Sequence, residues 1–254
     1  MSKRMDRLGE TLKNNVGSTM IIVDYRGALD IDVWFSEYDW TAEGVRYKDF
    51  QNGKIACPYE RRVYNVGYIG EGEYKVTING KPTKEYQVWH SMLRRCYNPE
   101  YQEKYPTYIG CSVVEEWHNF QNFAEWYKEN YYQIGDEVMA LDKDILFKHN
   151  KIYSPDTCIF VPTTINSLFV KCNASRGNLP VGVSFNKKTN KYVAYCRIND
   201  KKVTLGYYNE IKQAFEVYKV AKEQEIKRIA EEYKEQIPNN LYQAMMNWVV
   251  EIED

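Results

Sequence analysis

Apolar and polar residues alternate with period two near the start of the chain, which is the spacing of β-strands with one buried face. Residues 31–35 alternate in this way, residues 19–25 form a β-rich run, and a further run over 45–50 ends at the turn dipeptide Asn52–Gly53. Short strands separated by frequent turns predict a small β-barrel or sheet. We therefore expect an N-terminal β-rich module over residues 1–82.

Three glycines in this module, Gly67, Gly70 and Gly72, superficially resemble a phosphate-binding loop. Such loops join a strand to a helix, and no strand-then-helix pattern surrounds these glycines. The glycines therefore predict a turn.

The hydrophobic period changes to that of a helix near residue 84. Apolar residues recur at helical spacing up to Tyr97, and Asn98–Pro99 ends this helix. Residues 112–115 fit a helix-capping box, and an aromatic stripe follows, which we interpret as core rather than as a base-stacking surface. The stripe consists of Trp117, Phe120, Phe123, Ala124, Tyr127 and Tyr131. Two strands near 140–146 and 158–161 and a helix from Thr163 then predict a ββα unit, within a second domain over 83–172.

Three strand patterns and a long amphipathic helix fill the last part of the chain. The strands are expected over 182–185, 192–198 and 203–208, and the helix over 211–233. This pattern predicts a three-stranded antiparallel sheet packed on a helix, in a third domain over 173–254. The fold class is therefore α+β with several domains.

Strand alternation identifies the open face of this sheet. Tyr192, Ala194 and Cys196 point to one side, where the small alanine lets a helix pack closely, while Tyr195 and Arg197 point to the other. The expected open face carries Ser184, Asn186, Tyr195, Arg197, Lys202 and Thr204.

Charge is distributed unevenly along the chain. With 34 Lys and Arg against 35 Asp and Glu, the net charge of -1 argues against a simple polybasic nucleic-acid binder. Residues 176–208 alone, however, carry a net charge of +6. A basic, twisted sheet can enter the major groove of DNA, and a merely solvated sheet face is the alternative.

Composition excludes several other classes. No stretch approaches the ~20 apolar residues of a membrane helix, and no apolar segment follows the charged N-terminus, so we expect neither a membrane partner nor secretion. Six cysteines without a CxxC pair predict reduced thiols in the cytoplasm rather than a zinc site. Three histidines leave little material for a multi-histidine metal enzyme.

The C-terminal pattern resembles the three-strand-plus-helix DNA-binding domain of plant ethylene response factors and of many phage and mobile-element proteins. The resemblance rests on Gly182–Val183, on Tyr192 and Ala194, on Leu205–Gly206 and on Ala214 in the helix. It implies binding of double-stranded DNA, with DNA-facing positions at the six residues of the expected open face.

The middle of the chain resembles phage HNH-like endonucleases. Asp142 and Asn166 match the metal-ligand positions of their ββα motif, which implies a Mg²⁺ site if the protein is active. Lys143, however, occupies the position of the catalytic histidine and is a poor base, and Thr157 replaces an orienting asparagine. His149 is the candidate for a displaced base.

These patterns favour a phage or mobile-element DNA-binding protein in the cytoplasm of a bacterial host, built on a degenerate HNH scaffold. Its phosphate contacts are expected at Arg94, Arg95, Lys143, Lys187 and Lys188. One alternative is an active metal-dependent homing or nicking endonuclease. Another is a phage protein that binds and modulates a host protein. The N-terminal module resembles one found in phage proteins, where gripping DNA and docking a partner are equal hypotheses.

Overall fold

The chain folds into two compact units, Met1–Glu129 and Asn130–Asp254. The computed structural model describes residues 7–170 and 177–254. Both units combine helices with small sheets, so the expected multi-domain α+β class is confirmed. The predicted boundary after residue 172, together with Cys172 and Arg176, lies outside the described residues, and the boundary after residue 82 stays a prediction. Among the described helices none is both long and apolar enough to span a membrane.

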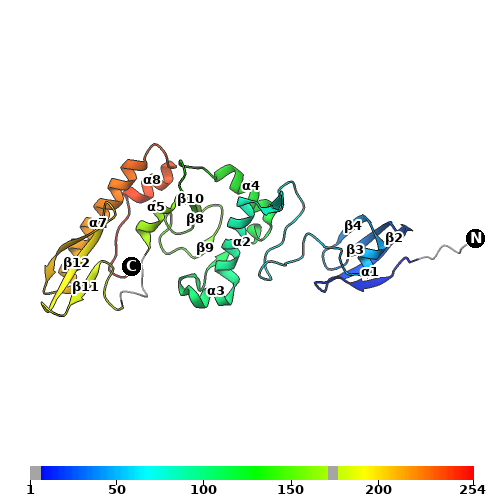
Figure 1. The fold of residues 1–254 in the computed structure, drawn as a ribbon, viewed down its shortest axis with the longest axis horizontal. Helices are drawn as coiled ribbons and strands as arrows, with labels where there is room; N and C mark the ends of the chain where they lie inside the picture. Colours follow the sequence, from blue (N-terminus) through cyan, green and yellow to red (C-terminus); the bar gives the residue numbers. More distant parts are fainter. Residues whose placement is uncertain (1–6, 171–176) are drawn as a thin grey trace, which may run out of the picture. The chain divides into compact units, whose positions relative to one another are not determined.

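The first unit begins with a four-stranded antiparallel sheet in the order β1-β2-β3-β4 (Figure 1). Its strands are β1 (Thr11–Lys13), β2 (Thr19–Gly27), β3 (Asp30–Phe35) and β4 (Trp40–Val45). The alternating residues Met20, Ile22, Ile31, Val33 and Phe35 are buried on one face. The strand expected over 45–50 is wrong.

The helix α1 (Tyr47–Gln51) stands in place of that strand. Tyr47 and Phe50 are three residues apart and therefore lie on one side of the helix turn, where both are buried in the sheet's core. The same two aromatic residues would point to opposite faces of a strand.

The rest of the first unit is helical with short strands. Its elements are β5 (Thr77–Ile78), β6 (Lys81–Pro82), α2 (Lys84–Tyr97), α3 (Pro99–Lys104), β7 (Ser112–Val113) and α4 (Phe120–Asn130), with 3₁₀ turns at Pro106–Tyr108 and Glu115–His118. The predicted end of α2 at Asn98–Pro99 is confirmed. The capping box is wrong, because Ser112 belongs to β7 and α4 begins only at Phe120.

The aromatic stripe forms core as expected. Trp117, Phe120 and Phe123 have no exposed surface, and the indole Nε1 of the equally buried Trp89 donates to the carbonyl of Trp117 at 2.7 Å. This bond satisfies the one polar atom of a large buried side chain.

The glycine run over 66–74 packs against these helices. A Cβ at Gly67 would overlap the side chains of Trp89 and Leu93, and one at Gly70 would overlap Asn119. These glycines therefore serve close packing against Trp89, Leu93 and Asn119.

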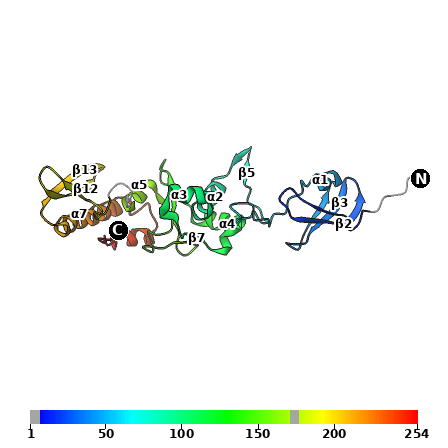
Figure 2. The same ribbon diagram turned by 90° about the horizontal axis from the view of Figure 1, so that it is seen from below.

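The second unit contains a ββα unit, whose strands are labelled in Figure 1, followed by a three-stranded sheet, whose strands β12 and β13 are labelled beside α7 in Figure 2. The ββα unit consists of β8 (Met139–Asp142), its antiparallel partner β10 (Ile159–Pro162) and α5 (Thr163–Asn166). In the sequence, β9 (Ile152–Tyr153) comes between the two paired strands, and a 3₁₀ turn at Ser167–Phe169 follows α5. The sheet has the order β11 (Val183–Asn186), β12 (Lys191–Ile198) and β13 (Lys201–Tyr208). The helices α7 (Ile211–Tyr233) and α8 (Asn239–Met246) follow.

The long helix α7 contributes to two separate cores. Its first half buries Ala214, Phe215 and Tyr218 against the three-stranded sheet. Its second half buries Ile226 and Ala230 in a core shared with β10, α5 and α8. The helix thus covers one face of the β11–β13 sheet and leaves the other face without a covering element among the described residues.

Candidate nucleic-acid interface

The strand register assigns the expected six residues to the uncovered face of the β11–β13 sheet. Tyr195 is paired with Thr204, Arg197 with Lys202, and Ser184 with Val193. The alternate residues Ala194 and Cys196 are buried beneath α7. Because side chains alternate between faces, Asn186 shares the uncovered side with Ser184. We call this surface the open face.

Positive charge on the open face is not neutralised locally. Arg197 and Lys202 lie directly opposite each other across two strands, a like-charge arrangement that costs stability. In the described part of the chain, no carboxylate lies within 4.0 Å of either residue or of Lys187 and Lys188. Arg228 on α7, by contrast, pairs with Glu225 at 2.8 Å. The open face is therefore suited to an anionic ligand.

An aromatic ring lies among these cations. The Lys202 ammonium lies 3.9 Å from the centroid of the Tyr195 ring, a cation–π distance. Lys202 is exposed and Tyr195 is half-buried. The contact restricts both side chains and so lowers the entropy cost of presenting them to a ligand.

Asn186 shapes the hairpin loop between β11 and β12. Its side-chain oxygen accepts hydrogen bonds from the backbone nitrogens of Lys188 at 2.9 Å and Thr189 at 3.3 Å. This Asx turn holds the loop that carries Lys187 and Lys188. The Asn186 oxygen is thus engaged, which leaves its amide nitrogen as the group suited to contact a base.

Glu225 on α7 holds the turn that joins β12 to β13, and the sequence patterns did not predict this role. This buried carboxylate accepts from the backbone nitrogen of Asn199 at 3.0 Å, in the turn that joins β12 to β13, and forms two hydrogen bonds with Arg228. The Arg228 guanidinium holds the pKa of Glu225 below its usual value. The available signal was position, since Glu225 follows Ala221 by four residues on the apolar stripe of α7.

Asp142 ends β8 and closes the next turn. Its Oδ1 accepts from the backbone nitrogens of Asp144 and Ile145, each at 2.8 Å, so the strand stops there instead of continuing to residue 146. Burial, followed by the neighbouring Asp144 charge, raises the pKa of Asp142 to about 6. Carboxylates whose pKa is raised by burial and by a neighbouring charge are more common at functional sites than elsewhere.

Lys143 points into the protein beside this carboxylate. It is only 7% exposed, its Nζ pairs with Asp144 at 3.0 Å, and it lies 5.7 Å from the centroid of the Tyr153 ring. A buried and paired ammonium is poorly placed to contact a DNA phosphate. It also cannot accept a proton while it remains charged.

The other candidate catalytic residues are not joined to Asp142. Asn166 is the last residue of α5, and within the described ranges no hydrogen bond links it to Asp142. Thr157 donates to the carbonyl of Ile152 at 2.9 Å and holds a turn. Asn150, which sequence reasoning gave no role, bonds the carbonyl of Lys143 at 2.7 Å and so holds the loop after β8.

His149 faces the C-terminal segment. Its Nε2 lies 3.4 Å from Glu251, and together with Asp254 these side chains place three metal-ligating atoms within 4.8 Å. The neighbouring Lys148 already pairs with both carboxylates, at 2.7 and 2.9 Å. The Lys148 ammonium thus offsets one of the two carboxylate charges, and His149 is placed to hold the C-terminal segment.

Arg94 and Arg95 belong to the first unit, at the end of α2. The Arg94 guanidinium lies 4.6 Å from the ring centroid of Tyr101, and that of Arg95 lies 5.6 Å from the ring centroid of Tyr108. Their setting is therefore aromatic and distinct from the open face.

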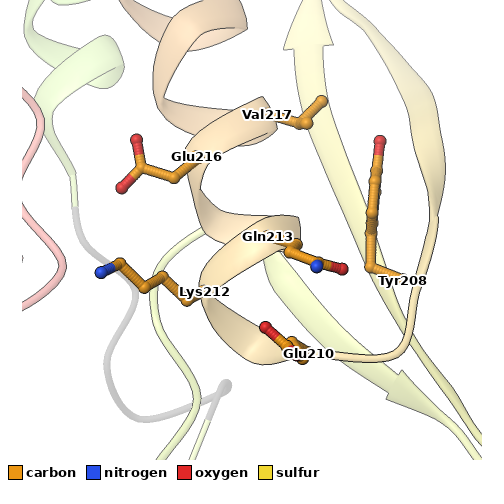
Figure 3. Close-up of a pocket in the computed structure, with 6 residues that line it drawn as sticks. All are labelled: Tyr208, Glu210, Lys212, Gln213, Glu216 and Val217. Carbon is orange, nitrogen blue, oxygen red and sulfur yellow. The ribbon is translucent and has the colours of Figure 1, made fainter.

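A shallow hollow lies at the start of α7. In Figure 3, Tyr208, Gln213 and Val217 lie where the helix faces β13, while Lys212 and Glu216 project from the opposite side. With one cation and two carboxylates, Glu210 and Glu216, this hollow has no charge preference that would favour a nucleic acid.

Comparisons with known proteins give no relative from which to transfer a function: no protein-family model matches the chain, and neither a curated protein nor a solved structure is significantly similar to it.

The raised pKa of Asp142 predicts a pH-dependent stability. The unfolded state loses this proton near pH 4, as an unperturbed aspartate does, whereas the folded state keeps it up to about pH 6. The free energy of unfolding should therefore fall as pH rises from about 4 to about 6. Asp142→Asn should remove this slope and raise stability at pH 7.5 by about 1–3 kcal/mol, because the pKa of Asp142 lies about two units above its usual value and each unit corresponds to about 1.4 kcal/mol.

Urea denaturation at a series of pH values measures this effect. Asp136→Asn, at an exposed position of the same unit, is the matched control and should leave the slope unchanged. A variant Asp142→Asn that is less stable than wild type at pH 7.5 would contradict the account of Asp142.

Proposed function

We propose that this protein binds double-stranded DNA selectively through the open face of its β11–β13 sheet. The observation that carries the proposal is the charge pattern of that face. Arg197 and Lys202 are paired on adjacent strands, and among the described residues no carboxylate lies within 4.0 Å of either one. Acidic residues nevertheless slightly outnumber basic residues in the whole chain. Phosphate neutralisation repays the cost of such a pair, and arginine is the commonest reader of guanine.

Different roles follow for different residues of the open face. Arg197, with Tyr195 beside it, lies on the central strand and would contact base edges. Lys187 and Lys188 lie on an exposed loop at the sheet's end and would contact phosphates. Arg94 and Arg95 remain proposed DNA contacts of the other unit.

The resemblance to ethylene-response-factor domains and to phage HNH-like proteins supports this reading. We place the protein in the cytoplasm of a bacterial host, as a phage or mobile-element DNA-binding protein on a degenerate nuclease scaffold. The pairing of Lys143 with Asp144 supports the loss of catalysis, because the residue at the position of the catalytic histidine is then a buried, charged ammonium that cannot accept a proton.

A first test separates phosphate contacts from base contacts. Lys187→Ala should weaken binding to every duplex and reduce the slope of log affinity against log salt by about 1, because one phosphate contact is lost. Fluorescence anisotropy between about 50 and 200 mM salt measures this slope. Lys212→Ala, which removes an exposed charge from α7, is the control. An unchanged slope in Lys187→Ala would remove that loop from the interface.

A metal-dependent endonuclease is the second candidate, favoured by the raised pKa of Asp142 near 6. A divalent cation would stabilise the charged form of this carboxylate. Supercoiled plasmid incubated with and without Mg²⁺ or Mn²⁺ separates the two functions. We expect the plasmid to remain supercoiled. Metal-dependent cutting that Asp142→Ala abolishes would establish the enzyme instead.

Binding and modulation of a host protein is the remaining alternative. It predicts that no duplex binds at physiological salt, which would also contradict our proposal.

A further inference from the structure

Three tyrosine rings form a group at the surface of the first unit. Tyr101 on α3 lies 4.6 Å from Tyr105 and 5.9 Å from Tyr108, measured between ring centroids, and both pairs are tilted by 39°. We call Tyr101, Tyr105 and Tyr108 the tyrosine platform. Other aromatic rings of this unit belong to its core, such as those of Trp89 and Phe120, which have no exposed surface.

A cation accompanies each ring of the tyrosine platform. Arg94 lies over Tyr101 at 4.6 Å, Arg95 over Tyr108 at 5.6 Å, and Lys104 over Tyr105 at 5.5 Å. For Arg94 and Lys104, no carboxylate within 4.0 Å is found in the described part of the chain. Helical spacing also places Glu103 on the side of α3 away from Tyr101. The platform therefore has a cationic edge.

A dense hydrogen-bond framework holds the platform. The Asn98 side chain caps α3 through the backbone nitrogen of Tyr101 at 2.7 Å. The Gln102 amide nitrogen donates to the carbonyls of Cys96 at 2.7 Å, Arg95 at 3.2 Å and Tyr108 at 3.4 Å. One side chain thus ties the end of α2 to the turn after α3. The rings are consequently pre-organised, which lowers the entropy cost of binding.

Packing within the unit explains only part of this arrangement. Tyr101 and Tyr108 are half-buried, but Tyr105 is 41% exposed, and the adjacent Ile109 is 59% exposed. Lys104, beside them, is exposed as well. An exposed aromatic edge lined with cations is the combination that binds single-stranded nucleic acid, where bases stack on rings and phosphates meet cations.

We propose that the tyrosine platform binds unpaired nucleobases, with Tyr105 as the stacking surface and with Arg94 and Lys104 contacting the phosphates. This site goes beyond the duplex-binding proposal, because its stacking ring Tyr105 and its cation Lys104 have no part in that proposal and because it takes a different ligand. Single-stranded DNA and RNA share the chemistry, and the two are separate arms of the test.

The test measures binding of the full-length chain to fluorescein-labelled oligothymidylate, to oligouridylate and to an abasic oligomer of equal length. Tyr105→Ala should weaken binding to the first two by about tenfold, because stacking is worth about 1–3 kcal/mol per base. Tyr105→Phe, which keeps the ring, should bind as wild type does. Neither variant should alter binding to the abasic oligomer, since that ligand has no base to stack.

Lys104→Gln provides a second variant at an exposed position. It should weaken binding to all three oligomers, because it removes a phosphate contact. Thymidylate affinity that is equal in wild type and Tyr105→Ala would overturn the proposal, as would an equal loss on the abasic oligomer. Arg197→Ala should not change the Tyr105-dependent difference. If no duplex binds but Tyr105→Ala still weakens binding of oligothymidylate, the duplex proposal is wrong and the proposal for the tyrosine platform is supported.

Discussion

Arg197→Ala is expected to lower the preference of the protein for its selected duplex over a scrambled duplex by about 10- to 100-fold. A two-pronged arginine contact to guanine contributes about 1–3 kcal/mol of discrimination against the wrong base. Arg197 lies on the central strand of the open face with Lys202 opposite it, so a base contact here would be central to the interface. The preferred duplex is first obtained by selection from a random library with the wild-type chain.

Two variants separate the geometry of Arg197 from its charge. Arg197→Lys keeps the charge but loses the planar fork, so it should bind scrambled DNA as wild type does and still lose selectivity. Lys201→Ala removes one charge from the same hairpin at a position paired with Ile198, away from the open face. It should retain selectivity. Equal selectivity in wild type and Arg197→Ala would remove Arg197 from the site.

Gly182→Ala is expected to destabilise the β11–β13 sheet by about 2–4 kcal/mol, the sum of backbone strain and overpacking. Gly182 has a φ of +75°, and a Cβ there would lie within 3.0 Å of the ring of Tyr218. Tyr218 is buried in the core between the sheet and α7, so its ring has little room to move.

Hydrogen exchange of the β12 amides measures this loss locally, so that the unfolding of one unit is not confused with that of the other. Gly177→Ala is the matched control, because Gly177 has a φ of +65° but no atom lies within 4 Å of its Cβ position. The control should cost only the backbone strain, about 1 kcal/mol. Equal effects of the two substitutions would show that the contact with Tyr218 is unimportant.

Hydrophobic periodicity predicted the elements whose stability depends on a long buried stripe. The helix expected over 211–233 matches α7, and the three C-terminal strands match to within two residues. Short segments were less predictable. Residues 45–50 are β-rich in composition, yet burial of Tyr47 and Phe50 on one side selects a helical turn. Tertiary packing decided the conformation there.

The candidate site was predictable where it depends on alternation and unpredictable where it depends on individual hydrogen bonds. Alternation along β12 correctly placed Tyr195 and Arg197 on the face opposite Ala194. It did not reveal that Asn186 closes a turn or that the buried Glu225 supports the next one. Such bonds join residues through a specific local geometry, and residue type alone does not determine that geometry.

Lysine footprinting of the unmodified chain, with and without its selected duplex, tests most directly whether the open face binds DNA. Acetylation followed by mass spectrometry reports each lysine separately, and exposed lysines on α7 serve as internal references. We predict that duplex DNA protects Lys187, Lys188 and Lys202, while Lys212 and Lys227 remain as reactive as in the free protein. Protection confined to α7, or no protection of Lys202 at a DNA concentration that saturates binding, would contradict the account.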